Sequence, residues 1–297
     1  MKLALRIEVA TLRGTREAVP RLAAILKEHG ARATFLLALG PDRTGRALGS
    51  LPRVPKLRCY GARALLSGTL LPAPDIGPRC ADVLRALPQD GHEAGILAYD
   101  RADWVNHIAV ADETWTAAAM QRARERYEEI FGVPALTHGA PAWRMNRYAY
   151  RHEQRLGFRH GSDTRGTGPF IPVVRGEIVA CPQLPTTLPL LEEVIAGGVA
   201  VEQAVQRLLD LTRGPASAGH VFALRAEVEE SLHASALRGL LAGWRALGIE
   251  PVPLRDYATG LELSRLPRRV VGEEDAAEAQ VAVEGKEFLA ESARGGD

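Results

Sequence analysis

Residues 3–40, LALRIEVATLRGTREAVPRLAAILKEHGARATFLLALG, decide the fold class of this chain. The two ends of this stretch, 3–9 and 31–40, are short apolar runs that are typical of buried strands. Between them, 15–29 has apolar side chains at helical spacing, and Gly30 ends the predicted helix. Because a strand–helix–strand unit pairs its strands in parallel, the sequence predicts an α/β architecture.

The same alternation of strands and helices continues along the chain. Apolar and β-branched runs predict further strands at 92–99, 136–139, 158–163, 220–228 and 249–254. Helical spacing predicts helices at 77–88, 112–131, 147–157, 199–212 and 232–248. Residues 41–76, rich in Gly, Pro and Arg, break the rhythm and indicate an insertion or a long loop. The order of elements therefore predicts one barrel-like α/β domain over 1–267.

The C-terminal segment 268–297 differs from this body in composition. The last part, 273–297, holds eight acidic and two basic residues, so its net charge is −6 in a chain of net charge +1. We expect an acidic, disordered tail and a mildly basic body. A basic body suits an anionic partner, although solvated surface lysines and arginines produce the same balance.

Composition restricts the class of protein and its surroundings. Aromatic residues make up only 5% of the chain, so we expect no stacking platform and no nucleic-acid partner. Cys59, Cys80 and Cys181 form no CxxC pair, which favours a reducing, cytoplasmic environment. The N-terminal apolar run contains Arg6 and Glu8 and is too short for a signal peptide. No window predicts a transmembrane helix, so we expect any contact with the inner membrane to be peripheral.

Polar side chains follow several of the predicted strands. Functional groups of parallel α/β folds gather where strands end and loops begin. The residues expected there are Glu8, Arg13, Asp100, Arg101, Asp103, Trp143, Arg144, Asp163, Arg165, Arg225 and Glu227. Arginines from five loops thus converge on one face, which we call the mouth, and histidine is nearly absent from it.

The order and spacing of several segments resemble a known family. They include GHEAGILAYD at 91–100, PAWR at 141–144, GFRHGSDTRGTGPF at 157–170 and HVFALRAEVEE at 220–230. Over about 1–257 the chain resembles the NodB-homology polysaccharide deacetylases, most closely the ArnD-type deformylases of undecaprenyl-phosphate-linked formamido-arabinose. The resemblance implies a distorted (β/α) barrel and a divalent-metal amide hydrolase acting on a sugar with a lipid carrier.

The chemistry that this resemblance implies needs five groups. Two aspartates after the first strand act as base and metal ligand, two histidines after the third strand complete the metal site, and a late histidine protonates the leaving amine. A bound cation lowers the pKa of water from its usual high value toward about 7. The matching positions here are Glu8, Ala10, Leu97, Arg101 and Arg225. Alanine and leucine cannot coordinate a metal, so we expect no metal, no confident catalytic residue and a catalytically inactive, pseudoenzyme-like homologue.

Two arrangements of the mouth stay open. Arg101 and Arg225 could fill it by pairing with Glu8, Asp100 or Glu227. Alternatively, the mouth is an anion-binding pocket in which guanidinium groups hold a phosphate or a sugar acid. The ligand-binding residues would then be Glu8, Arg13, Arg101, Trp143, Arg144, Asp163, Arg165 and Arg225. In the family, the arginine matching Arg144 orients the catalytic carboxylate, so Arg144 could pair with Glu8.

A displaced metal site is a further alternative. Asp100, Asp103 and His107 have the spacing i, i+3, i+7 and would lie on one helical face, where they could hold zinc. A capping role for the two aspartates and a surface position for His107 explain the same spacing. We interpret His138 as a hydrogen-bonded structural residue.

These observations lead to a hypothesis of a binding, regulatory or structural subunit in the modification of lipid-linked envelope sugars, such as aminoarabinose on lipid A. Its partner would be a protein, such as an active homologue, or a phosphate- or sugar-bearing lipid-linked ligand. The alternative is an active metal-dependent C–N hydrolase that deacetylates or deformylates a sugar with a rearranged site.

Overall fold

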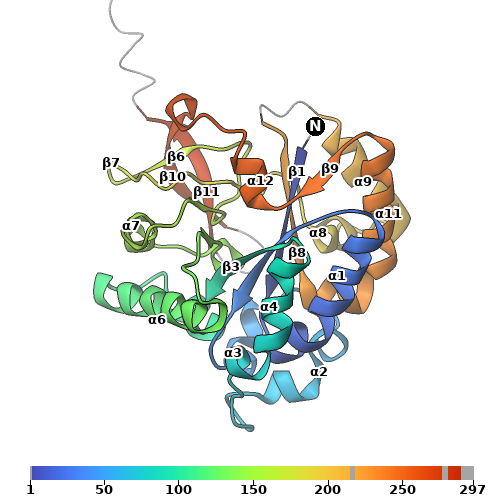
Figure 1. Cartoon of the computed structure of the whole chain (residues 1–297), viewed down its shortest axis with the longest axis horizontal. Coiled ribbons are helices and arrows are strands. Elements are labelled where there is room, and N and C mark those ends of the chain that lie inside the picture. The colour runs from blue at the N-terminus through green and yellow to red at the C-terminus, as the bar shows by residue number, and fades with distance from the viewer. Residues whose placement is uncertain (1, 215–217, 276–279, 289–297) are drawn as a thin grey trace, which may run out of the picture.

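A seven-stranded parallel sheet forms the centre of the computed structural model, which describes residues 2–214, 218–275 and 280–288 (Figure 1). The strands of the sheet are β1 (Lys2–Val9), β2 (Thr34–Ala38), β3 (Glu93–Ala98), β4 (Thr137–His138), β5 (His160–Gly161), β8 (His220–Arg225) and β9 (Glu250–Val252). Their order is β5-β4-β3-β2-β1-β8, and β9 pairs with β1. All pairs are parallel, so the expected α/β fold with a distorted, half-barrel sheet is confirmed.

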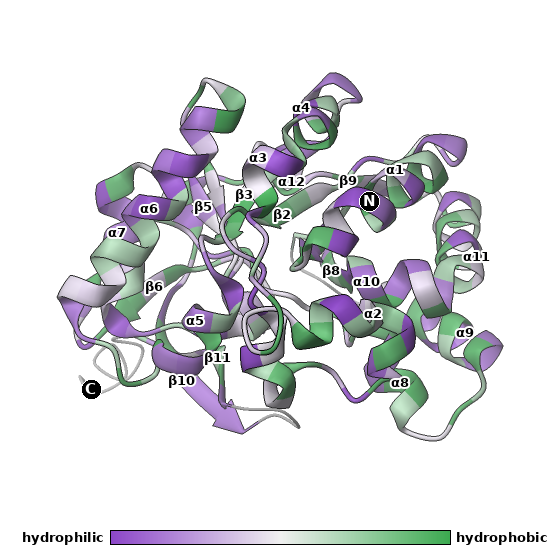
Figure 2. Cartoon of the chain, turned by 90° about the horizontal axis from the view of Figure 1, so that it is seen from below, coloured by the Kyte–Doolittle hydropathy of each residue, from purple (hydrophilic) through white to green (hydrophobic). Residues whose placement is uncertain are grey.

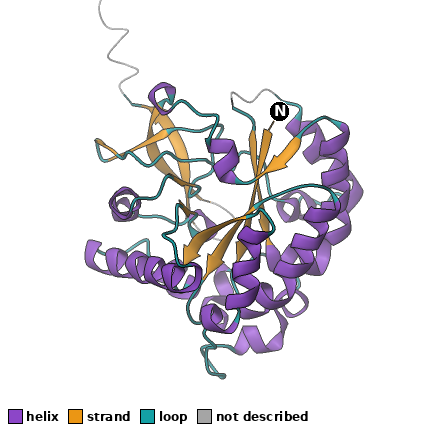
Figure 3. Ribbon diagram, viewed as in Figure 1, coloured by secondary structure: helices purple, strands orange, loops and turns teal. Residues whose placement is uncertain are grey.

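Helices connect the strands and cover the outer side of the sheet (Figure 3). The longer ones are α1 (Val19–Glu28), α2 (Lys56–Leu66), α4 (Ala81–Gln89), α6 (Glu113–Phe131), α7 (Arg147–Leu156), α9 (Val201–Thr212) and α11 (Ala234–Ala246). The short ones are η1 (Gly14–Ala18), η2 (Thr44–Ser50), α3 (Ile76–Arg79), α5 (Arg101–His107), η3 (Pro141–Trp143), α8 (Leu191–Ala196), α10 (Ala226–Val228), η4 (Glu229–His233), α12 (Leu254–Ala258) and η5 (Leu263–Arg265). No helix of the described part is both long enough and apolar enough to cross a membrane.

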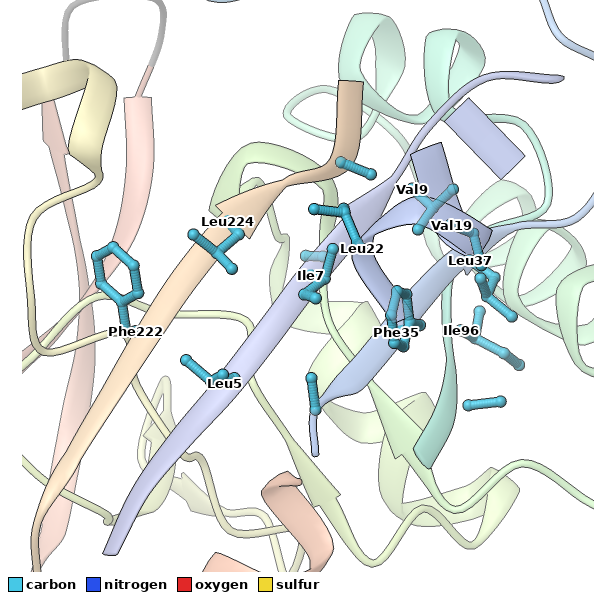
Figure 4. Close-up of a cluster of buried hydrophobic side chains, with 14 of the residues drawn as sticks. Leu5, Ile7, Val9, Val19, Leu22, Phe35, Leu37, Ile96, Phe222 and Leu224 are labelled. Carbon is cyan, nitrogen blue, oxygen red and sulfur yellow. The ribbon is translucent and has the colours of Figure 1, made fainter. Parts of the chain in front are cut away.

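Strand β1 separates the outer core from the interior of the half-barrel. Successive side chains of a strand point to opposite faces, and Leu5, Ile7 and Val9 join the outer core beside Phe35 and Leu224 (Figure 4). The alternate positions of β1 therefore face the interior. This alternation buries two charged residues of β1, Arg6 and Glu8, inside the half-barrel.

Three predicted elements have different boundaries. The helix expected at 15–29 is divided into η1 and α1, with Pro20 in the first turn of α1, where its missing N–H is tolerated. The 41–76 segment, expected to be an insertion or a long loop with one helical turn, contains two helices, η2 and α2. The strand expected at 220–228 stops at Arg225, and α10 follows it.

A second sheet lies on the other side of the molecule (Figure 1). Its order is β11-β10-β6-β7, with β6 (Ile171–Val174), β7 (Glu177–Ile178), β10 (Arg268–Asp275) and β11 (Gln280–Glu287). β10 pairs in parallel with β6 and antiparallel with β11.

The second sheet includes much of the segment that we expected to be a disordered tail. β10 is strongly hydrophilic (Figure 2), as the acidic composition requires, yet it pairs with both neighbours. In β11, Val281 and Ala282 are buried against the body. The expectation of disorder is therefore corrected for β10 and β11, and residues 289–297 lie outside the described part.

Candidate functional site

An apolar cluster lies where β1, β2 and β3 end, at the position where members of the family that this chain resembles would hold the metal. Leu36, Ala38, Ile76 and Leu97 are buried in this cluster, and Ala10 and Leu12 pack against it. Leu97 has no exposed surface. Ala10 and Leu97 are two of the positions where the resemblance requires metal ligands, and neither has a donor atom. The residues present therefore do not fit a divalent metal at this place.

Glu8 has a buried cation as its partner inside the half-barrel. Arg6 Nη2 lies 2.7 Å from Glu8 Oε1, and Arg6 Nη1 donates to the carbonyl of Ser162 at 2.8 Å. The same guanidinium stacks over the ring of Trp143 at 5.2 Å from its centroid. Burial lowers the pKa of Arg6, and the charge of Glu8 opposes this effect. The expected pairing of Glu8 with Arg144 is therefore wrong.

Arg101 and Arg144 lie together at the mouth without a carboxylate partner among the described residues. Arg101 donates to the carbonyl of Ser50 at 3.0 Å and to its hydroxyl at 3.4 Å. Arg144 donates to the carbonyl of Val105. Burial and then the charge of Arg101 lower the pKa of Arg144. Arg13 instead donates to two backbone carbonyls of α2, at 3.0 and 3.1 Å.

Glu227 does not pair with an arginine but holds the loop after β1. Its Oε1 accepts hydrogen bonds from the backbone N–H of Ala10 at 3.0 Å, and from the N–H and hydroxyl of Thr11 at 2.9 Å each. Burial raises the pKa of Glu227, opposed by these hydrogen bonds. A β-carbon at Gly14 would collide with this carboxylate, so glycine is required there.

The remaining mouth charges also have partners that the sequence did not identify. Arg225 Nη1 lies 3.3 Å from Glu192 Oε1, and Arg43 Nη1 lies 2.7 Å from Asp100 Oδ2. The described residues therefore show none of the ion pairs that we expected between Arg101 or Arg225 and the three acidic residues of the mouth.

Asp100, Asp103 and His107 do not converge on one point. Asp100 caps α5 by accepting from the N–H of Asp103 at 3.0 Å, and its other oxygen pairs with Arg43. Burial raises the pKa of Asp100. His107 Nδ1 lies 2.9 Å from the carbonyl and 3.0 Å from the carboxylate of Asp103. Capping and local pairing thus account for all three residues.

Two guanidinium groups lie against the ring of Trp143. Arg6 stacks over its ring and Arg165 lies 4.9 Å from the ring centroid, while its indole N–H donates to Thr186 Oγ1 at 3.0 Å. Arg165 also makes a two-pronged ion pair with Glu193, at 2.6 and 2.8 Å. The backbone of Trp143 has φ of 53°, a left-handed conformation that is uncommon for a bulky residue.

A second buried charged group was missed by sequence reasoning. His138 Nδ1 lies 2.9 Å from Glu153 Oε1 and 2.8 Å from Asp163 Oδ1, and these side chains are at most 2% exposed. Burial lowers the pKa of His138, but the Asp163 and Glu153 carboxylates outweigh it and raise this pKa to about 10. Glu153 lies on the buried face of α7 beside Ala149 and Tyr150, and a carboxylate on that face was the available signal.

Gln183 completes this group. Its Nε2 donates to Glu153 Oε2 at 3.0 Å and to Asp163 Oδ2 at 2.9 Å, and its Oε1 accepts from the N–H of Asp163 at 3.0 Å. Among the described residues, His138, Glu153 and Asp163 are the only group of at least three histidine, cysteine or acidic side chains whose donor atoms all lie within 4.8 Å. They are also the residues of the described chain that could hold a metal ion.

Comparison with solved structures defines the class of fold. A polysaccharide deacetylase assigned in Mycobacterium smegmatis superposes with a TM-score of 0.64 at 17% identity, over 93% of this chain and 94% of that one. A CE4 family pseudoenzyme from Bacillus anthracis gives a TM-score of 0.51 at 12% identity, over 86% of this chain and 64% of that one. The fold is that of the CE4, or NodB-type, polysaccharide deacetylases.

Comparison of the amino-acid sequence with those of assigned proteins identifies the family within this fold. A Shewanella sediminis protein assigned as 4-deoxy-4-formamido-L-arabinose-phosphoundecaprenol deformylase ArnD is 30% identical over 262 residues, covering 85% of this chain and 84% of that protein. A protein of the same name from Wigglesworthia glossinidia brevipalpis is 27% identical over 226 residues, 73% of this chain and 78% of that protein. The chain therefore belongs to the ArnD deformylase family. No family model matches the sequence.

Proposed function

We propose that this chain is a member of the deformylase family that does not hydrolyse amides and acts as a binding, regulatory or structural subunit. The apolar cluster around Ala10 and Leu97 carries this proposal. Amide hydrolysis in the fold needs a cation to activate water and polarise the carbonyl, and the cluster leaves no donor atoms for that cation. Glu8, the carboxylate at the position that matches the family's base, is held by the buried Arg6.

The ligand that we propose is an anionic, lipid-linked sugar, bound at the mouth from the cytoplasmic side of the inner membrane. The names of the relatives describe a formamido sugar attached to phosphoundecaprenol, which contains phosphate. Arg101 and Arg144 support such a ligand because each is tied to backbone carbonyls and has no carboxylate partner among the described residues. Guanidinium groups suit phosphate because they donate two parallel hydrogen bonds. The alternative partner is an active homologue of this chain.

The first experiment measures turnover. Purified protein, supplied with zinc, manganese or cobalt, is incubated with formamido- and acetamido-sugar lipids, and released formate or acetate is measured. We expect no turnover above the protein-free control. Turnover by the natural sequence that disappears on chelation would overturn the proposal. A variant with Ala10→Asp, Leu97→His, Arg101→His and Arg225→His restores four of the five residue types of the family and keeps the carboxylate of Glu8, so turnover by this variant would show that the assay detects the reaction.

The second experiment measures binding. The natural chain should bind vesicles containing a polyprenyl phosphate sugar, and Arg101→Ala with Arg144→Ala should weaken this binding at least tenfold. Arg207→Ala, an exposed arginine of α9, is the matched control and should leave binding unchanged. Equal binding by all three proteins would contradict a ligand at the mouth and favour a protein partner.

One observation favours an active hydrolase with a rearranged site, namely the His138, Glu153 and Asp163 group. Burial argues against this second candidate, because a sugar cannot reach side chains that are at most 2% exposed. Turnover that is lost in His138→Gln but retained in Glu8→Gln would establish it.

A further inference from the structure

The buried group formed by His138, Glu153 and Asp163 has a donor arrangement that its neighbours orient toward one point. We propose that these three side chains form a structural binding site for a divalent cation of the zinc class, separate from the mouth. The imidazole Nδ1 lies 2.9 Å from Glu153 Oε1 and 2.8 Å from Asp163 Oδ1. Nitrogen and oxygen ligands at about 2.0–2.1 Å from tetrahedral zinc are about 3.3 Å apart, so small side-chain movements would admit the ion.

Gln183 and Ala140 orient the carboxylates toward that point. Gln183 Nε2 donates to the far oxygens, Glu153 Oε2 and Asp163 Oδ2, and leaves the two near oxygens directed at His138. The N–H of Ala140 also holds Asp163 Oδ1, at 2.7 Å. Hydrogen bonds of this outer kind set the direction of metal ligands and are typical of metal sites.

The charges of the group are compatible with a bound cation. Two carboxylates with no exposed surface are costly to bury in the ionised form unless protons or a cation compensate them. A dication bound to one imidazole and two carboxylates makes the set neutral. Arg6 does not supply this charge, because it is already paired with Glu8.

Tyr150 is an independent observation that points to a bound group. It lies one turn before Glu153 on α7, is only 2% exposed, and its hydroxyl has no hydrogen-bond partner among the described residues. Zinc with three protein ligands keeps a fourth position for water, and such a water would give this hydroxyl a partner.

The consequence of the site is structural. Its ligands come from β4, α7 and the segment after β5, and the loop that carries Trp143 and Arg144 connects β4 to α7. A bound ion would link the segments on both sides of this loop in the chain and so restrict the movement of Trp143 and Arg144. Gly161 lies against the same group, and a β-carbon there would collide with Asp163, Gln183 and Glu153.

The test is metal content and metal-dependent stability of the full chain. After expression with added zinc and gel filtration, elemental analysis should find about one zinc per chain in the natural protein. Glu153→Gln and Gly161→Ala should lose it, whereas His107→Gln, the exposed control, should keep it. Zinc added to chelator-treated protein should raise the melting temperature of the natural chain and of His107→Gln, but not of Glu153→Gln.

Two results would overturn the inference. One is a natural chain that holds no zinc and whose melting temperature is unchanged by millimolar zinc, which would leave a network held by protons alone. The other is equal zinc binding by Glu153→Gln, which would place the ion elsewhere. Sugar deformylation is a separate measurement, so zinc without turnover supports both proposals, and zinc with turnover overturns only the proposed function.

Discussion

The buried ion pair between Arg6 and Glu8 allows the role of Glu8 to be measured as a free energy. Arg6 has no exposed surface, Glu8 is 4% exposed, and their charged atoms are 2.7 Å apart. Replacing Glu8 by leucine leaves the guanidinium buried without its counter-charge. Removal of one partner of a buried pair costs about 3–5 kcal/mol.

The contacts of Arg6 determine where the loss in free energy of unfolding falls within about 3–5 kcal/mol. Charges about 4 Å apart attract by about 4 kcal/mol at an effective dielectric constant near 20. The guanidinium keeps its bond to the Ser162 carbonyl and its stacking on Trp143, which retain part of the stabilisation. We therefore expect Glu8→Leu to lower the free energy of unfolding by about 3 kcal/mol, and Arg6→Met to lower it by a similar amount. The double variant should lie within about 1–2 kcal/mol of the natural chain, because apolar replacement of a whole buried pair is often neutral.

Urea denaturation followed by circular dichroism and tryptophan fluorescence at pH 7 measures this double-mutant cycle. The matched control is the half-exposed pair Arg124–Glu128, at 2.8 Å on α6, for which each substitution should cost well under 1 kcal/mol. A loss below 1 kcal/mol for Glu8→Leu would refute the reasoning. Glu8 would then be free of Arg6 in solution and available to accept a proton.

Three further predictions concern the mouth and the thiols. Leu97→Ala should lower the free energy of unfolding by about 2–5 kcal/mol in urea melts, because it leaves a cavity in the apolar cluster. Gly14→Ala should cost about 1–3 kcal/mol by displacing Glu227, whereas Gly49→Ala, whose β-carbon meets nothing within 4 Å, should change stability by less than 1 kcal/mol. All three cysteines are buried and burial raises the pKa of Cys59 to about 11, so Ellman's reagent at pH 8 should label none of them until the chain is unfolded.

The sequence predicted the sheet well because apolar runs indicate strands without any knowledge of their neighbours. The lack of donor atoms at Ala10 and Leu97 can be seen in the sequence itself, since an alanine or a leucine has no donor side-chain atom in any geometry. The ion pairs and hydrogen bonds between distant residues could not be predicted from such local patterns. Arg6 interrupts an apolar run, and only the alternation of β1 beside the 138–163 segment shows that it meets Glu8, Ser162 and Trp143.

In the C-terminal strands, the acidic composition obscured the alternation of apolar residues that indicates a strand. The acidic residues of 268–287 dominated the prediction of disorder, yet Val281 and Val283 alternate as a strand requires. Val281 is buried with Trp143, Leu190 and Ala223, and Val283 packs against this group. These partners are distant in sequence, so the stabilising contacts could not be inferred from the segment itself.

Ala10 and Leu97 belong to one apolar cluster, so a single substitution does not rebuild a metal site there. A histidine at position 97 would place an imidazole in a cluster where Leu97 has no exposed surface and no polar partner is present, and an unpaired buried polar group costs about 1–3 kcal/mol. It would still lack the ligand missing at Ala10. Arg101→His alone should therefore bind no zinc at the mouth, whereas the site that we propose at His138 should still bind zinc. Titration calorimetry of Arg101→His in the Glu153→Gln background separates the two sites. Tight zinc binding there would show that the mouth retains donors outside the apolar cluster.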